Sequence, residues 1–149
     1  MYKIFSILVC ISVIMSFDKE DIIEVLENYN YDFGKSNYSE IIRYFNYPVS
    51  FNLKERTITA SNKFKLRLIY RKIIGDLPEF YSYSKWDKID IQLIDDSIVI
   101  VNAQYSRFKN DNTVYESGSA QYNLRLIDGK WKIFSLTPYN NSFKFCDED

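Results

Sequence analysis

Apolar and polar residues alternate on both sides of Asp128-Gly129, near the end of the 149-residue chain. Asp-Gly between two alternating runs is typical of a two-residue type I′ hairpin turn, whose central residues need positive φ. Counting outward from this turn predicts the cross-strand pairs Ile127–Lys130, Leu126–Trp131, Leu124–Ile133, Tyr122–Ser135 and Ala120–Thr137. One face of the hairpin is therefore expected to be apolar near the turn and polar at the far end.

Helical periodicity dominates the first half of the chain. Residues 18–33 carry apolar side chains at three- and four-residue steps, which predicts an amphipathic helix followed by Gly34. Residues 37–46 predict a second, shorter helix that stops before the next proline. Residues 49–53 and 57–60 then predict a small hairpin.

A third helix is predicted to begin after Ser61, a suitable N-cap, and to end near Gly75. Its inward side chains are expected to be Phe64, Leu68 and Ile69. After it the period changes to two, and the predicted strands are 86–94, 98–108, 114–127 and 130–138. Helices followed by an antiparallel meander are typical of the α+β class.

The two central strands pair across a loop whose length sets their register. If residues 110–113 form a four-residue loop, Arg107 pairs with Glu116 and Tyr105 with Gly118. A three-residue loop would mix polar and apolar side chains on both faces, so burial favours the longer loop. The inner face would then have an apolar floor of Val99, Val101, Leu124, Leu126, Trp131 and Ile133. A ligand-binding mouth is expected above it, formed by Tyr105, Tyr122, Ser135 and Thr137, with Arg107 and Glu116 at the rim.

The composition restricts the chemistry. The chain has no His, which excludes His-dependent nucleophile systems and removes the commonest transition-metal ligand. With Cys10 and Cys146 as the only thiols, neither a metal site nor a cofactor is expected. The net charge is −1, from 19 basic and 20 acidic residues without a basic block, so nucleic-acid binding is not expected.

Residues 1–16 form an apolar leader before the domain. The run Ile4–Phe17 has 14 residues, too few for a stable transmembrane span and typical of a signal-peptide core. The alternative is that translation starts at Met15, directly before the first helix. The protein would be exported in the first case and cytoplasmic in the second, and the sequence leaves both open. The domain is predicted to span residues 18–140, followed by a polar tail, residues 141–149.

The order of the elements and three motifs resemble the nuclear-transport-factor-2-like superfamily, in particular its SnoaL-like branch. The motifs are Tyr47-Pro48-Val49-Ser50-Phe51, Tyr105-Ser106-Arg107-Phe108 and Asp128-Gly129-Lys130-Trp131-Lys132-Ile133. The resemblance covers about residues 18–140 and implies a cone-shaped, curved antiparallel sheet wrapped around three N-terminal helices, a cystatin-like α+β barrel. It also implies a pocket open at one end. Members include cofactor-free enzymes and binding modules, so the fold does not select the activity.

Two carboxylates are candidates for acid/base catalysis. Glu116 is on the inner face, where burial would raise its pKa, or else forms an ion pair with Arg107 at the rim. Asp32, near the end of the first helix, enters the cone or is solvated. The ion pair and the solvated carboxylate are the expected states. Ketosteroid isomerases of the superfamily carry a carboxylate base after the second helix, and residues 47–52 contain no acid.

The other sheet face is polar but carries little charge. Its side chains are expected to be Asn102, Gln104, Ser106, Ser117, Ser119, Gln121 and Asn123, with Ile98, Ile100, Phe134 and Leu136. Such a face is typical of a protein interface, and sheet-to-sheet dimers are usual in the superfamily, so a homodimer is expected. The expected function is binding of a small, partly apolar ligand in the cone. The alternative is a cofactor-free isomerase, cyclase or hydrolase that uses a pocket carboxylate and a Tyr.

Overall fold

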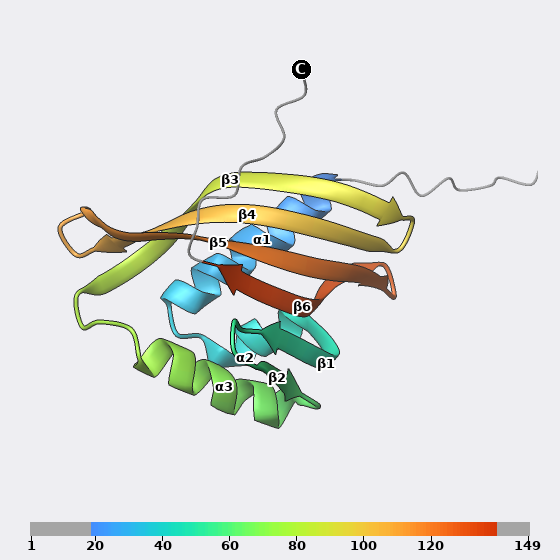
Figure 1. Cartoon of the computed structure of the whole chain (residues 1–149), viewed down its shortest axis with the longest axis horizontal. Helices are drawn as coiled ribbons and strands as arrows, with labels where there is room; N and C mark the ends of the chain where they lie inside the picture. The colour runs from blue at the N-terminus through green and yellow to red at the C-terminus, as the bar shows by residue number, and fades with distance from the viewer. Residues whose placement is uncertain (1–18, 140–149) are drawn as a thin grey trace, which may run out of the picture.

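The computed structural model describes residues 19–139, in which helices pack against one curved sheet (Figure 1). The predicted leader, the polar tail and both cysteines lie outside the described residues. The elements are α1 (Lys19–Gly34), α2 (Tyr38–Ile41), the 3₁₀ helix η1 (Ile42–Tyr44), β1 (Phe45–Asn52), β2 (Thr57–Ala60), α3 (Lys63–Gly75), β3 (Tyr81–Asp95), β4 (Ile98–Lys109), β5 (Val114–Ile127) and β6 (Lys130–Tyr139). No helix within residues 19–139 has the length and hydropathy needed to cross a bilayer.

Six strands form one sheet in the order β2-β1-β6-β5-β4-β3. All neighbouring strands are antiparallel except β1 and β6, which run parallel. In Figure 1, α1 crosses behind β3, β4 and β5, and α3 lies on the side of β1 and β2. The α+β class and the helices wrapped by a curved sheet are confirmed. The expectation of an entirely antiparallel sheet is wrong for one pair, because β1 inserts beside the last strand of the chain.

The register of the meander agrees with the alternation of the sequence at five of the predicted pairs. Asp128 and Gly129 have φ of 50° and 73°, as a type I′ turn requires. The confirmed pairs are Ile127–Lys130, Leu126–Trp131, Leu124–Ile133, Tyr105–Gly118 and Arg107–Glu116. The choice of the longer loop between β4 and β5 is therefore correct.

A β-bulge changes the register of β6 beyond the turn. Phe134 is an extra residue that has no partner in β5, so every later residue of β6 changes face relative to simple alternation. The pairs after the bulge are Asn123–Ser135, Tyr122–Leu136, Gln121–Thr137 and Ala120–Pro138. The predicted pairs Tyr122–Ser135 and Ala120–Thr137 are wrong. Leu136, which we expected on the outer face, is buried on the inner one.

Hydrogen bonds to β1 give the bulge a physical reason. The Asn52 amide donates to the hydroxyl oxygens of Ser135 at 2.9 Å and Thr137 at 3.1 Å, and Ser50 donates to Ser135 at 3.2 Å. These contacts hold the two hydroxyls of β6 against its parallel neighbour. Leu136 is then free to join the core, where its side chain gains more from burial than a hydroxyl would.

The helices differ from their predictions in length and phase. The second helix stops early, because Phe45 already belongs to β1. The N-cap of α3 is Asn62 and not Ser61: the Asn62 side chain accepts a hydrogen bond from the amide of Lys65 at 3.0 Å. Phe64 and Leu68 are 72% and 46% exposed, whereas the buried residues of α3 are Leu66 and Tyr70. The predicted inner face of the third helix is therefore wrong for Phe64 and Leu68, whereas Ile69 is partly buried and packs against the core.

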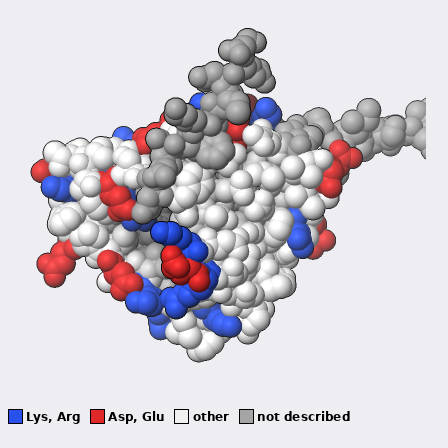
Figure 2. All heavy atoms as spheres, viewed as in Figure 1, with Lys and Arg blue, Asp and Glu red and all other residues white. Residues whose placement is uncertain are grey.

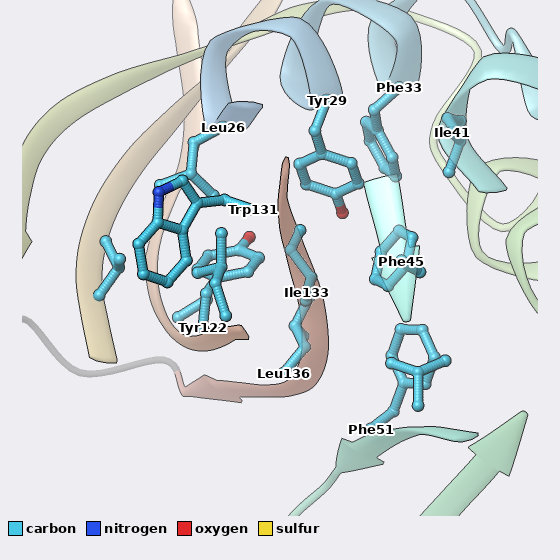
Figure 3. Close-up of a cluster of buried hydrophobic side chains, with 14 of the residues drawn as sticks. Leu26, Tyr29, Phe33, Ile41, Phe45, Phe51, Tyr122, Trp131, Ile133 and Leu136 are labelled. Atoms are coloured by element: carbon cyan, nitrogen blue, oxygen red, sulfur yellow. The ribbon is translucent and has the colours of Figure 1, made fainter. Parts of the chain in front are cut away.

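The core lies between α1 and the inner face of the sheet. Ile22 and Leu26 of α1 are fully buried, and Trp131 of β6 is 6% exposed. Figure 3 shows Trp131 beside Leu26, and Tyr29 and Phe33 of α1 pointing toward Phe45. The predicted burial of the floor is confirmed for Val99, Val101, Leu124, Trp131 and Ile133. Further along the same face the packing opens into a pocket.

Candidate functional site

A pocket of about 230 Å³ lies between the helices and the inner face of the sheet. Its wall comes from α1, α3, β1 and the four strands of the meander. The lining residues are Tyr29, Asn30, Phe33, Phe51, Leu53, Tyr70, Ile73, Ser84, Trp86, Tyr105, Arg107, Ala120, Tyr122, Leu136 and Pro138. A mostly apolar, aromatic wall with a few polar groups is the usual form of a small-molecule site.

The deep part of the pocket is a cluster of tyrosine and phenylalanine rings. The hydroxyls of Tyr29 and Tyr70 lie 3.0 Å apart and share a hydrogen bond. The ring centroid of Tyr29 is 5.8 Å from that of Phe45 and 6.1 Å from that of Tyr122, both edge to face. Burial raises the pKa of Tyr29 to about 12 and that of Tyr70 well above its ordinary value. At neutral pH these hydroxyls are therefore protonated and serve as structure, not as bases.

Tyr105 lies flat across the neighbouring strand, and a glycine makes this possible. Gly118 is its direct cross-strand partner. A Cβ atom at Gly118 would lie 2.6 Å from the Tyr105 hydroxyl oxygen and 2.8 Å from Cζ, distances that real Cβ atoms do not tolerate. Trp86 of β3 flanks the ring on the other side, edge to face at 6.4 Å. Glycine at this position therefore lets Tyr105 line the pocket.

Arg107 is held next to this ring. Its guanidinium carbon is 5.2 Å from the centroid of Tyr105, and its Nη1 donates to Glu116 Oε2 at 2.8 Å. Burial alone would lower the pKa of Arg107, but the neighbouring Tyr105 and Glu116 outweigh burial, so the pKa is raised. Arg107 remains a cation at the pocket wall.

Glu116 forms the ion pair that the sequence favoured. The pair is half buried, with 20% of the Arg107 side chain and 42% of the Glu116 side chain exposed. Glu116 is not among the residues that line the pocket. The carboxylate therefore orients the guanidinium instead of pointing into the pocket as a base.

Asp32 is neither solvated nor in the cone, so both of its predicted states are wrong. It is 8% exposed and lies between α1 and the segment that follows. Its carboxylate accepts hydrogen bonds from the Tyr44 hydroxyl at 2.6 Å and from the Asn37 amide at 3.0 Å. These bonds join the end of α1 to α2 and η1, which is a structural role.

Ser135 and Thr137 do not line the pocket, because the bulge in β6 turns them to the outer face and to Asn52. Of the four predicted mouth residues, only Tyr105 and Tyr122 are in the wall. On the helix side of the pocket, Tyr29 is part of the wall, whereas Tyr44 and Phe45 are not.

Sequence reasoning missed several wall residues. The predicted strand starts at Trp86, but β3 begins at Tyr81, so Trp86 lies within the edge strand β3 and pairs with Tyr105 of β4. Leu136 takes the place predicted for hydroxyl groups. Phe51 enters from β1, whose parallel pairing with β6 has no local sequence signal. Only the alternation of Tyr81, Tyr83 and Lys85 offered a hint that β3 begins early.

A second hollow of about 300 Å³ lies between the start of α1 and the β5–β6 turn. Asp21, Glu24, Lys130 and Lys132 contribute charges of both signs to its wall. Burial, helped by the neighbouring Lys130, lowers the pKa of Lys132, whose ammonium donates to the carbonyl of Arg43. Such a charged groove is less suited to a partly apolar ligand than the aromatic pocket. Within residues 19–139 no group of three His, Cys, Asp or Glu side chains could hold a metal ion.

Solved structures with the same architecture come from several bacteria. A protein of unknown function with a cystatin-like fold from Nostoc punctiforme superposes with a TM-score of 0.70 at 14% identity, over 83% of this chain and 90% of that one. An NTF2-like protein of unknown function from Shewanella oneidensis superposes with a TM-score of 0.64 at 13% identity, over 80% of this chain and 96% of that one. A candidate scytalone dehydratase from Novosphingobium aromaticivorans superposes with a TM-score of 0.64 at 13% identity, over 83% of each chain. At such identities the likeness shows the fold alone.

The sequence itself identifies the family. No curated protein matches the chain at a significant level. Residues 19–141, which include every element described above, match the family described as NTF2-like protein (DUF6841). The resemblance inferred from the order of elements and from the three motifs is confirmed, and the chain belongs to this NTF2-like family.

Proposed function

We propose that the protein binds a small, partly apolar molecule in the pocket between α1, α3 and the sheet. The observation that carries this proposal is a pocket of about 230 Å³ whose wall is aromatic and aliphatic except at one end. A core that served stability alone would be expected to close such a space, because interiors pack to high density. The pocket is left open although Tyr and Phe side chains surround it.

An acid/base enzyme is the alternative, and the geometry supports it less. None of the residues that line the pocket is an Asp or Glu, within the part of the chain that the structure describes. Glu116 is paired with Arg107, and Asp32 is engaged by Tyr44 and Asn37. The tyrosines of the wall have raised pKa values through burial, which makes them poor bases at neutral pH. Binding without chemistry is therefore the function that we favour.

A neutral fluorescent probe tests the proposal. N-phenyl-1-naphthylamine is apolar, brightens in apolar sites and accepts energy from tryptophan, and Trp86 lies in the pocket wall. We expect saturable binding of one probe per chain, with quenching of tryptophan emission. Ala120→Met adds volume inside the pocket and should weaken binding by about tenfold or more, since the methionine side chain occupies the site.

The matched control places the same residue on an exposed position. Val114 is 51% exposed and is not part of the wall, so Val114→Met should leave the affinity unchanged. Absence of saturable binding to the unaltered protein, or equal affinity of the Ala120→Met variant when it is folded, would contradict the proposed function.

We also propose that the protein is a homodimer through the outer face of β4, β5 and β6. Figure 2 shows that the sheet face turned away from α1 carries little charge, and that charged side chains gather around its edges. Asn102 and Ser119 on this face are only 3% and 1% exposed, and Gln121 donates to Asn102 at 3.2 Å. A charge-poor face on which these two amides already bond one another costs little to desolvate, which favours a second copy as its partner.

A further inference from the structure

The pocket wall contains a cation and no anion. Arg107 is the only charged residue that lines the pocket, within residues 19–139. A charge at an otherwise apolar wall is unfavourable, because the free energy lost on desolvation is offset only when a suitable partner interacts with the charge. Glu116 supplies part of that compensation from the rim. The side chain of Arg107 is nevertheless the less exposed of the two, with 20% exposed against 42% for Glu116.

The ion pair leaves most of the guanidinium available. A guanidinium carries five N–H donors in a planar fork, and Glu116 accepts from Nη1. The ring of Tyr105 supports one side of the group at 5.2 Å and is itself seated over Gly118. The guanidinium is thus fixed in orientation before any ligand arrives, which lowers the entropy lost on binding.

Other polar groups of the wall are already used within the protein. The Asn30 amide donates to the Ser84 carbonyl at 2.9 Å, and the Trp86 indole donates to the Leu26 carbonyl at 3.1 Å. The hydroxyl of Tyr105, by contrast, has no hydrogen-bond partner among the described residues. Arg107 and Tyr105 lie side by side in the pocket wall, so their donors can act together on one ligand group.

We propose that the ligand is an amphiphilic anion, with a carboxylate or sulfonate head bound by Arg107 and Tyr105. Its apolar body lies against Phe51, Tyr122 and Leu136. This inference rests on the proposed function, and it adds the charge of the ligand and the residue that selects it. Charge-assisted hydrogen bonds to a guanidinium are stronger than neutral ones, so the head group contributes both affinity and orientation.

A pair of probes that differ by one anionic group provides the test. 8-Anilinonaphthalene-1-sulfonate has the same two aromatic groups as N-phenyl-1-naphthylamine and adds one sulfonate. A purely apolar pocket prefers the neutral probe, because it is the more hydrophobic of the two. We expect the opposite order: the sulfonate should bind the unaltered protein at least about tenfold more tightly, and added salt should reduce this preference.

Two variants assign the preference to Arg107. Arg107→Met combined with Glu116→Gln removes both charges together and leaves no lone carboxylate, so the variant should prefer the neutral probe. Glu116→Gln alone keeps the cation and removes its competitor, so the affinity for the sulfonate should rise several-fold while that for the neutral probe is unchanged. Circular dichroism and thermal unfolding establish that each variant is folded.

The outcomes separate this inference from the proposed function. If the neutral probe binds in the pocket and the sulfonate binds no more tightly, the ligand is not selected by charge and the inference is wrong. A preference that survives in the folded double variant also overturns it. If the double variant does not fold, the Glu116→Gln variant alone decides. The inference is then wrong if its affinity for the sulfonate stays constant or falls. If neither probe binds, the proposed function itself fails.

Discussion

Gly118 decides where the side chain of Tyr105 lies, and through it the position of Arg107. The sequence predicted this pair from the register, because alternation on both strands leaves one pairing that buries the apolar face. It could not predict that the ring lies flat against the glycine, since a side-chain orientation depends on neighbours such as Trp86 from a third strand. Local patterns therefore predict which residues meet but not how they meet.

Gly118→Ala is expected to weaken ligand binding. The added methyl group would lie 2.6 Å from the Tyr105 hydroxyl oxygen and 2.8 Å from Cζ, so the ring must move. Arg107 then loses the surface that supports its guanidinium. We expect about tenfold weaker binding of 8-anilinonaphthalene-1-sulfonate and a loss of about 1 to 3 kcal/mol in the free energy of unfolding. Fluorescence titration and urea unfolding measure the two effects.

Gly75→Ala is the matched control. A Cβ atom at Gly75 meets nothing within 4 Å, and the residue lies at the end of α3 outside the pocket wall. Its affinity for the probe should equal that of the unaltered protein, and its stability should change by less than about 1 kcal/mol. Equal affinities of both alanine variants would mean that Tyr105 does not shape the site.

At the scale of elements, α3 shows why helical phase is difficult to read from one sequence. The helix carries two apolar stripes, Phe64 with Leu68 and Leu66 with Tyr70. Only the second packs against the core, where Tyr70 shares a hydrogen bond with Tyr29 of α1. Which stripe is buried depends on the position at which the β1–β2 hairpin leads into α3. The sequence of the helix alone does not contain this information.

Leu66→Ala tests the observed phase of α3. Leu66 is fully buried, so its truncation leaves a cavity and should cost about 2 to 5 kcal/mol of unfolding free energy. Leu68→Ala makes the same chemical change on the exposed stripe, where the residue is 46% exposed, and should cost less than about 1 kcal/mol. Urea unfolding of both variants measures the difference. If Leu68→Ala lost more unfolding free energy than Leu66→Ala, the helix face predicted from the sequence would be the buried one.

The sheet shows the same division between local and long-range information. Turns and alternation predicted the order of β3 to β6 and the pairs close to Asp128 and Gly129. The bulge at Phe134 and the parallel pairing of β1 were not predictable, because both depend on Asn52 meeting Ser135 across 83 residues of sequence. The error moved two hydroxyls into the expected site and Leu136 out of it. The pocket is consequently more apolar than the sequence indicated.

At the scale of the whole molecule, charge is distributed unevenly over the surface. Figure 2 shows Lys and Arg side chains gathered over α3 and the turn between β1 and β2, and little charge over the middle of the sheet. Residues 102, 104, 106, 117, 119, 121 and 123 of the outer face are all Asn, Gln or Ser. This face lies opposite the pocket across the sheet, so a second copy of the chain can cover it without closing the ligand site.

Dimerisation through this face is expected to be sensitive to charge. Gln121→Lys combined with Asn123→Glu places two ions where each would be desolvated by the partner, while both side chains are only half buried in one chain. We expect light scattering to report twice the 17.8 kDa of one chain for the unaltered protein and a single chain for the variant. Charges of the same signs at exposed residues outside this face, Ser61→Lys and Asn110→Glu, should leave the dimer intact.

The two substituted residues both lie on β5, so their effect can be assigned to the outer face of the sheet. Both side chains lie on the face that does not touch the pocket, so a dissociated variant that still binds the neutral probe would locate the interface and separate it from the ligand site. The same circular dichroism spectrum for variant and unaltered protein would show that the monomer remains folded. If light scattering shows that the unaltered protein stays monomeric at high concentration, the proposed dimer interface is wrong. In that case the amides of Asn102 and Gln121 would serve only the sheet, where the Gln121 side chain donates to that of Asn102.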